Sequence, residues 1–113
     1  MKAQPKPLLW LGDSLDEVKA FSDEAKRSAG HQLERIQFGL DPLDWKPMEN
    51  VGAGVKEIRI RVEAAYRVLY VAKFIEAVYV LHVFVKKTPK TSKNDLDLAI
   101  KRYRALTKDR STK

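Results

Sequence analysis

The chain has 113 residues, which is enough for one domain with a single modest hydrophobic core. Hydrophobic residues make up 44% of the sequence, a composition that is typical of globular proteins and excludes a disordered chain. There is no cysteine, so disulfides, thiolate metal ligands and cysteine nucleophiles are excluded, and two widely separated histidines argue against a histidine-based metal site.

The formal net charge of +7 comes entirely from the last quarter of the chain. Residues 1–85 contain 12 basic and 12 acidic residues, whereas residues 86–113 contain 10 basic and 3 acidic residues. A basic segment on a neutral body indicates a polyanionic partner, and a solvated tail is the alternative. No apolar run reaches the roughly 18 residues that a membrane-spanning helix needs, and the first residues lack the apolar stretch of a signal peptide. We therefore expect a cytoplasmic protein without a membrane partner.

The N-terminal third of the chain predicts a strand followed by a pair of helices. A short apolar run at residues 8–11 predicts the strand. Ser14 opens the pattern Ser-Leu-Asp-Glu, which is typical of a capping box, and Ser22 provides a second helix start with acidic residues behind it. Together these signals predict a helical pair at about residues 14–38, with Gly39 as its C-cap.

Three extended segments follow a connecting loop. Residues 39–54 contain several turn-forming Pro and Gly residues and are predicted as that loop. Residues 57–62 alternate between charged and apolar side chains, and residues 66–71 and 77–85 are rich in β-branched and aromatic residues. The short gaps between these segments predict an antiparallel meander. The nearly continuous hydrophobicity of the third segment predicts a central position in the sheet.

The chain closes with a basic loop and a final helix, which Ser92 or Asn94 could cap. The apolar stripe of this helix consists of Leu96, Ala99, Ile100, Tyr103 and Leu106. The predicted order is therefore β-α-α-β-β-β-α, which is an α+β fold. We expect one domain over residues 1–113, with frayed ends at about residues 1–6 and 108–113.

Six basic side chains lie on or next to the predicted strands: Arg59, Arg61, Arg67, Lys86, Lys87 and Lys90. In an antiparallel meander, charges at the ends of strands can converge on one surface of the sheet. Such a surface suits a phosphate backbone, and positioned cations can also stabilise the charge that develops on a phosphate during cleavage. The alternative is an ordinary solvent-exposed face, on which Glu57 and Glu63 offset the nearby arginines.

His82 and the strand tyrosines are explained better by packing than by catalysis. His82 lies inside the most apolar segment, which predicts a buried structural histidine, and alternation places it on the same face as Phe84 and Lys86. Three tyrosines could stack on nucleic-acid bases, although packing within the sheet is the simpler interpretation: Tyr66, Tyr70 and Tyr79.

Several motifs, in their order along the chain, resemble the RelE/ParE toxin superfamily and, within it, the phage-derived HigB-like branch. These motifs are Gly54-Val55-Lys56-Glu57-Ile58-Arg59-Ile60, Tyr66-Arg67-Val68-Leu69-Tyr70, Val78-Tyr79-Val80-Leu81-His82-Val83-Phe84 and Lys86-Lys87-Thr88-Pro89-Lys90-Thr91. The segment Asp44-Trp45-Lys46-Pro47-Met48 also looks like that branch. The resemblance covers roughly residues 7–107, and its order of strands and helices agrees with the order predicted above.

This resemblance implies the toxin of a type II toxin–antitoxin pair that acts as a ribosome-dependent mRNA endonuclease. In RelE-like and HigB-like toxins, the 2′-hydroxyl of the messenger attacks the adjacent phosphate, which leaves a 2′,3′-cyclic phosphate or 3′-phosphate and a 5′-hydroxyl. The implied partners are mRNA in the ribosomal A site and a cognate helix-turn-helix antitoxin. The toxin supplies cations, a proton acceptor and base stacking, and the resemblance implies no cofactor and no metal.

The matching motifs imply roles for individual residues. The residues expected to bind the reacting phosphate and to stabilise its phosphorane-like state are Arg59, Arg67 and Lys87. The residues expected to hold the neighbouring RNA are Arg61, Lys86 and Lys90. The general base is not assigned, and the two candidates are His82 and a lysine. A lysine would need a lowered pKa, which neighbouring cations could provide.

Two departures from the family pattern leave other functions open. Glu57 stands where some relatives carry a lysine, and the C-terminal segment lacks a tyrosine that some relatives use, because Tyr103 lies too deep in the helix stripe to replace it. The alternatives are a ParE-like gyrase inhibitor, a toxin fold without activity and a phage-derived nucleic-acid-binding module. The set of Arg59, Arg67 and Lys87 favours the nuclease, because a gyrase inhibitor needs no cations for phosphate cleavage.

Overall fold

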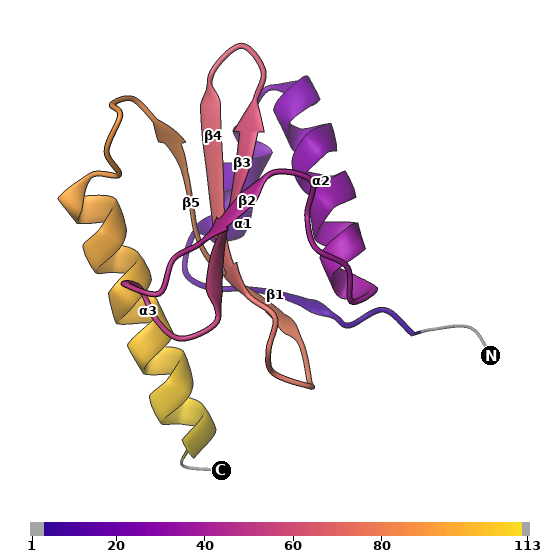
Figure 1. The fold of residues 1–113 in the computed structure, drawn as a ribbon, viewed down its shortest axis with the longest axis vertical. Coiled ribbons are helices and arrows are strands. Elements are labelled where there is room, and N and C mark those ends of the chain that lie inside the picture. The colour runs from indigo at the N-terminus through magenta and orange to yellow at the C-terminus, as the bar shows by residue number, and fades with distance from the viewer. Residues whose placement is uncertain (1–3, 112–113) are drawn as a thin grey trace.

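The computed structural model describes residues 4–111 as three layers, with a five-stranded sheet between helices on its two faces (Figure 1). The strands are β1 (Leu8–Trp10), β2 (Trp45–Pro47), β3 (Val55–Arg61), β4 (Ala65–Val71) and β5 (Val78–Lys86). The helices are α1 (Ser14–Lys19), α2 (Asp23–Gln37) and α3 (Lys93–Ser111). The predicted α+β class, with an N-terminal helical pair and a C-terminal helix, is confirmed.

The sheet has the strand order β1-β5-β4-β3-β2. The predicted antiparallel meander is confirmed for β3, β4 and β5, and β5 is an interior strand with β4 on one side and β1 on the other. Two features differ from the prediction. The N-terminal strand β1 pairs parallel to β5, and the predicted loop over residues 39–54 contains β2, which pairs antiparallel with β3. A three-residue strand that ends in Pro47 is too short to show alternation in the sequence.

Each face of the sheet has its own hydrophobic core. On the face covered by α1 and α2, the largest buried residues of the core are Phe21, Leu33, Ile36, Ile58, Ile60, Tyr66 and Tyr70. On the face covered by α3, they are Met48, Leu69, Tyr79, Leu81, Phe84 and Leu106. Because both faces are covered, β4 and β5 are buried on both sides, which accounts for the nearly continuous hydrophobicity of the β5 sequence.

The two N-terminal helices begin differently. Ser22 caps α2 as predicted, since its hydroxyl accepts a hydrogen bond from the Ala25 amide at 3.2 Å. The predicted capping box of α1 is wrong, because Ser14 is the first residue of the helix rather than its cap. Asp13 occupies the cap position without a side-chain cap bond, and its carboxylate instead accepts a bond from Arg102 of α3 at 2.8 Å.

The C-terminal end of α2 and the N-terminal end of α3 lie where the sequence predicts them. Gly39 follows α2 with a φ of +83°, a conformation that glycine adopts readily, and Ser92 caps α3 by accepting a hydrogen bond from the amide of its third following residue. Both predicted frayed ends contain described residues: α3 continues through Ser111, and the Lys6 amine donates to two backbone carbonyls. The other predicted frayed residues at 1–3 and 112–113 lie outside the described part. Within residues 4–111, no helix is long and apolar enough to span a membrane.

Candidate functional site

The strand register gathers basic side chains on the face of the sheet that α3 partly covers. Cross-strand partners share a face, so β3, β4 and β5 form three rows of side chains there. The rows are Arg61–Ala65–Lys86, Arg59–Arg67–Phe84 and Glu57–Leu69–His82. The first row lies at the open end of the sheet, next to the β3–β4 hairpin and the β5–α3 connection at the top of Figure 1.

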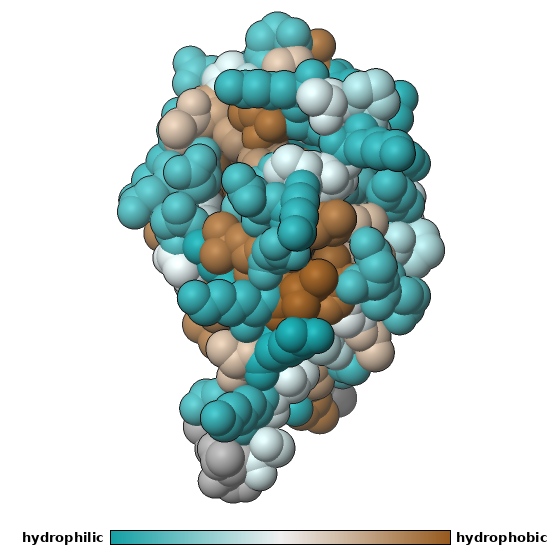
Figure 2. All heavy atoms as spheres, turned by 90° about the vertical axis from the view of Figure 1, so that its left-hand side faces the viewer, coloured by the Kyte–Doolittle hydropathy of each residue, from teal (hydrophilic) through white to brown (hydrophobic). Residues whose placement is uncertain are grey.

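We call the cations at this end the basic face; they are Arg59, Arg61, Arg67, Lys86 and Lys87. All of them except Arg59 line one open depression of about 450 Å³, together with Ala65, Thr88 and Pro89. Lys90 lies outside this depression and lines a neighbouring one, which Lys86 and Lys87 share. The side of the molecule that carries α3 is mostly hydrophilic, with hydrophobic side chains visible between the charged ones (Figure 2). The predicted cations are therefore neighbours in space, and Lys90 lies at the margin of the group.

Arg67 is the central cation of the basic face and the most deeply buried one. Only 5% of the residue is exposed, and its Nη1 donates to the Tyr66 carbonyl at 3.0 Å. Its Nε lies 3.4 Å from a carboxylate oxygen of Glu57, which is itself fully buried. Burial lowers the pKa of the Arg67 guanidinium, and the charge of Glu57 opposes that effect. Arg67 is therefore a cation held in one position at the floor of the basic face.

Two residues at β2 complete the charge arrangement: Asp44 precedes the strand and Lys46 lies on it. Sequence reasoning did not identify either as part of the site. Asp44 binds Arg59, with a distance of 2.8 Å to Nη2, and lies 4.0 Å from Nε of Arg61. Lys46 is the cross-strand partner of Glu57, and its amine lies 3.9 Å from that carboxylate. Both residues lie in the segment that was predicted to be a loop, so only the pairing of β2 with β3 brings them to the site.

Lys86 has the most altered electrostatic environment among the lysines of the basic face. It ends β5 and is half-buried, and this burial is the largest cause of a pKa below the ordinary value for lysine. The charges of Arg67, Lys46 and Arg59 lower the pKa further, and only Glu57 opposes them. A lysine with a lowered pKa carries a larger fraction of neutral amine, which is the form that accepts a proton. Lys87 follows it in the chain and is exposed.

His82 is a buried structural residue, as the sequence indicated. Its Nε2 lies 2.7 Å from the Asp95 carboxylate at the start of α3, and its Nδ1 lies 3.5 Å from Nη1 of Arg102. The ring also stacks on Phe84, with 5.3 Å between ring centroids. Both ring nitrogens therefore face groups of α3, and His82 is not among the residues that line the depression. The structure gives His82 a role in attaching α3 to the sheet.

The tyrosine side chains are used for packing and for contacts within the chain. The three strand tyrosines are buried in the cores on the two faces of the sheet: Tyr66, Tyr70 and Tyr79. Tyr103 of α3 donates from its hydroxyl to the Ala53 carbonyl at 2.9 Å, and its ring lies so close to Gly52 that a Cβ there would clash. Packing is therefore confirmed for the strand tyrosines, and the hydroxyl of the half-buried Tyr103 is bound to the segment before β3.

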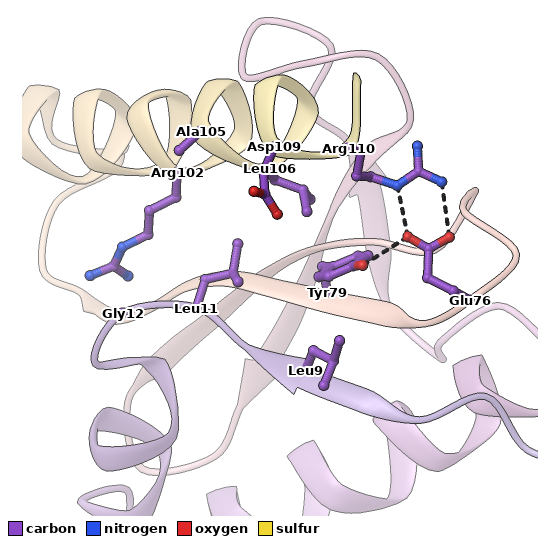
Figure 3. A pocket seen from close by; sticks show the side chains of 10 residues that line it. All are labelled: Leu9, Leu11, Gly12, Glu76, Tyr79, Arg102, Ala105, Leu106, Asp109 and Arg110. Atoms are coloured by element: carbon purple, nitrogen blue, oxygen red, sulfur yellow. Dashed lines mark hydrogen bonds and ion pairs between the residues drawn. The ribbon is translucent and has the colours of Figure 1, made fainter. Parts of the chain in front are cut away.

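A second concave region lies between β1, β5 and the C-terminal half of α3, and we call it the α3 groove (Figure 3). Its volume is about 730 Å³, and its apolar walls are formed by Leu9, Leu11, Tyr79, Ala105 and Leu106. Two arginines at its rim are bound by acids. Arg102 binds Asp13 at 2.8 Å, and Arg110 binds both carboxylate oxygens of Glu76, at 2.7 and 2.9 Å. The bonds from Arg110 hold the pKa of Glu76 at about 2, well below its ordinary value.

Comparison with known proteins gives a family match and leaves the activity open. A family model described as phage-derived protein Gp49-like (DUF891) matches residues 16–104. The matched span contains every strand except β1 and includes the whole basic face. No curated protein matches the chain. Within residues 4–111, no group of three or more His, Asp or Glu side chains could hold a metal ion.

Proposed function

Since the chain belongs to the phage-derived Gp49-like family, which is a RelE-like toxin family, we propose that it is a type II toxin that cleaves mRNA on the ribosome. The observation that carries this proposal is the basic face. Four cations line one open depression, and no acid is among the residues that line it. Of the acids near these cations, Glu57 is fully buried, Asp44 is bound by Arg59 and Asp95 is bound by His82. A surface with such an excess of positive charge suits the phosphates of a single RNA strand.

In the proposed reaction, Lys86 is the general base and Arg67 the principal electrostatic stabiliser. The neutral amine of Lys86 accepts the proton of the messenger's 2′-hydroxyl, and the 2′-oxygen forms a bond to the adjacent phosphorus. The bond from phosphorus to the 5′-oxygen breaks, water protonates that oxygen, and a 2′,3′-cyclic phosphate remains. Arg67 and Arg59 stabilise the additional negative charge of the phosphorane-like state. Lys87 supports them as a further cation at the phosphate.

The neighbouring nucleotides are held by the remaining cations of the region, which are Arg61 and Lys90. Lys86 is preferred to His82 as the base because its environment lowers its pKa and because it lines the depression. His82 would have to leave Asp95 and Arg102 before it could accept a proton from RNA. A helix-turn-helix antitoxin is the proposed protein partner, and the ribosomal A site is where the chain would meet its substrate.

The test is induced expression in a bacterium, with growth recorded and transcript 5′ ends mapped with and without a translation inhibitor. We expect growth arrest and new 5′ ends that disappear when translation is blocked. Lys86→Met should reduce cleavage by about 100-fold or more, which is the usual contribution of a general base. Lys108→Met is the matched control, since it removes an exposed lysine of α3 and should leave cleavage unchanged.

Other outcomes separate the alternatives. Growth arrest without new 5′ ends would contradict the nuclease and favour a gyrase inhibitor or another target. Cleavage that persists when translation is blocked would contradict dependence on the ribosome. Neither arrest nor cleavage from folded protein would indicate a toxin fold that only binds.

A further inference from the structure

Glu57 is an unusual residue for the middle of a sheet. It is fully buried, and neither of its carboxylate oxygens has a hydrogen-bond partner among the described residues. The nearest cations are Nε of Arg67 at 3.4 Å and the Lys46 amine at 3.9 Å. A buried charge that lacks hydrogen bonds is costly, and a pair of apolar residues would fill the same space at lower cost. Packing alone therefore does not explain a carboxylate at this position.

The charges around Glu57 come from every strand near it. Lys46 lies on β2 and Arg59 on β3, with Arg67 on β4 and Lys86 on β5. Asp44 binds Arg59, and Arg61 and His82 lie on the same face. From α3, which packs against this face, Asp95 and Arg102 contact His82. Glu57 is thus the buried negative charge among several cations. It lies two rows below the open end of the sheet, so it does not reach a bound substrate.

We propose that Glu57 is a positioning residue: its buried carboxylate holds the Arg67 guanidinium beneath the reacting phosphate and offsets the charge of the cations that lie around Lys86. This inference rests on the proposed function for its catalytic consequence. Arg67 lies directly opposite Arg59 in the sheet, and like charges in that position repel each other. The carboxylate beneath them offsets this repulsion. It is also the charge that counters the three cations acting on Lys86.

The test compares Glu57→Gln with the wild-type chain by two measurements. The first is an NMR titration of the Lys86 side chain, assigned by its loss in Lys86→Met. The glutamine keeps the shape and removes the charge, so the pKa of Lys86 should fall by about half a unit to one unit. The second is the pH dependence of RNA cleavage. The rise of the rate with pH should move to lower pH by the same amount, and the plateau should fall about tenfold or more because Arg67 loses its partner.

Glu34→Gln is the matched control, because it removes the same charge from the exposed surface of α2 on the opposite side of the sheet. It should change neither the Lys86 titration nor the pH profile. If Glu57→Gln does not fold, Glu57→Asp takes its place. The aspartate keeps the charge but withdraws it from Arg67, so the pKa of Lys86 should stay close to the wild-type value while cleavage falls.

The results separate this inference from the proposed function. If the wild-type chain cleaves no RNA, the proposed function fails, and a shifted Lys86 titration in Glu57→Gln still supports the electrostatic role of Glu57. An unchanged Lys86 titration in Glu57→Gln overturns the inference. A lowered plateau without any shift of the pH profile also overturns it, since that result would follow from a purely structural role.

Discussion

The two concave regions of this molecule differ in how their charges are balanced. The α3 groove is the larger, at about 730 Å³ against about 450 Å³ for the depression of the basic face. Its two arginines bind acids from other segments of the chain. On the basic face, Arg67 faces the buried Glu57 and Arg59 binds Asp44, whereas no ion pair within residues 4–111 joins Lys86 or Lys87 to an acid. The larger concave region, the α3 groove, therefore lies where α3 passes over the edge of the sheet. The basic face is the region whose positive charge is not fully neutralised, and it is the one that suits an anionic ligand.

The difference also shows what the ion pairs do in each region. In the α3 groove, Arg102 joins α3 to Asp13 and to the Leu81 carbonyl, and Arg110 joins it to Glu76 before β5. These bonds hold the helix on the sheet. On the basic face, Glu57 lies beneath the cations and leaves their outer side open. Substitutions in the groove should therefore affect stability, and substitutions on the basic face should affect RNA cleavage.

The largest expected effect is a loss of RNA cleavage when the Glu57–Arg67 ion pair of the basic face is neutralised. The double variant Glu57→Gln/Arg67→Gln should lose at least about 100-fold in cleavage, because the central cation is gone. Its free energy of unfolding should change by only about 1 kcal/mol, since both buried charges are removed together. Arg67→Gln alone should cost about 3 kcal/mol, because it leaves Glu57 buried without its nearest cation. Urea denaturation and a cleavage assay measure the two quantities.

The matched control for this pair lies in the α3 groove. Glu76→Gln/Arg110→Gln makes the same change of charge and should leave cleavage unchanged. An equal loss of cleavage from both double variants would remove the distinction between the two regions. It would show that the total charge of the chain, rather than the position of Arg67, determines activity.

A smaller effect on stability, without an effect on cleavage, is expected for Arg102→Leu. The guanidinium donates to the Leu81 carbonyl at 2.9 Å and to Asp13 at 2.8 Å, and a hydrogen bond to a charged group is worth about 1.5–3 kcal/mol. We expect the free energy of unfolding to fall by about 2 kcal/mol in urea. Lys101→Leu changes the exposed neighbour on α3 and should stay within about 0.5 kcal/mol. A loss of cleavage by folded Arg102→Leu would mean that the two regions are coupled.

Sequence reasoning identified the cations of the basic face and named Glu57 as an acid that could offset them, but it did not place Asp44 or Lys46 at the site. Alternation along β3 correctly placed Arg59 and Arg61 on one face, because a period of two is a local property of the chain. The alternative that placed Glu57 on an ordinary solvent-exposed face is wrong for this residue, which is fully buried. Its burial depends on Lys46 of β2 and on the core beneath α3, and pairing between distant segments leaves no local pattern.

The helix signals show the same limit. Ser22 is a cap because the bond that it makes lies within one turn, so the sequence contains the whole motif. Ser14 has the same local signature, but Arg102 of α3 binds Asp13 and the helix starts one residue earlier than the pattern suggests. The parallel pairing of β1 with β5 is likewise a contact between segments about 70 residues apart in the sequence, since Leu8 pairs with Val78.

The smallest expected effect is on the pH dependence of the free energy of unfolding. The α3 groove and the basic face should contribute to it in different pH ranges. The pKa of Glu76 is about 2 in the folded chain and ordinary in the unfolded chain, so its stabilising contribution is present above the ordinary value and is lost as the pH falls toward 2. The pKa of Lys86 is also lowered on folding, so protonation of this lysine opposes folding, and stability rises as the pH increases toward the ordinary lysine value. Urea denaturation across pH should therefore show an acidic rise that Arg110→Ala reduces and an alkaline rise that Lys86→Met reduces. Part of the acidic rise should remain in Arg110→Ala, because the pKa values of Asp13 and Glu63 are also lowered on folding. If either variant diminished both rises, the two regions would share one electrostatic network, and the distinction between them would fail.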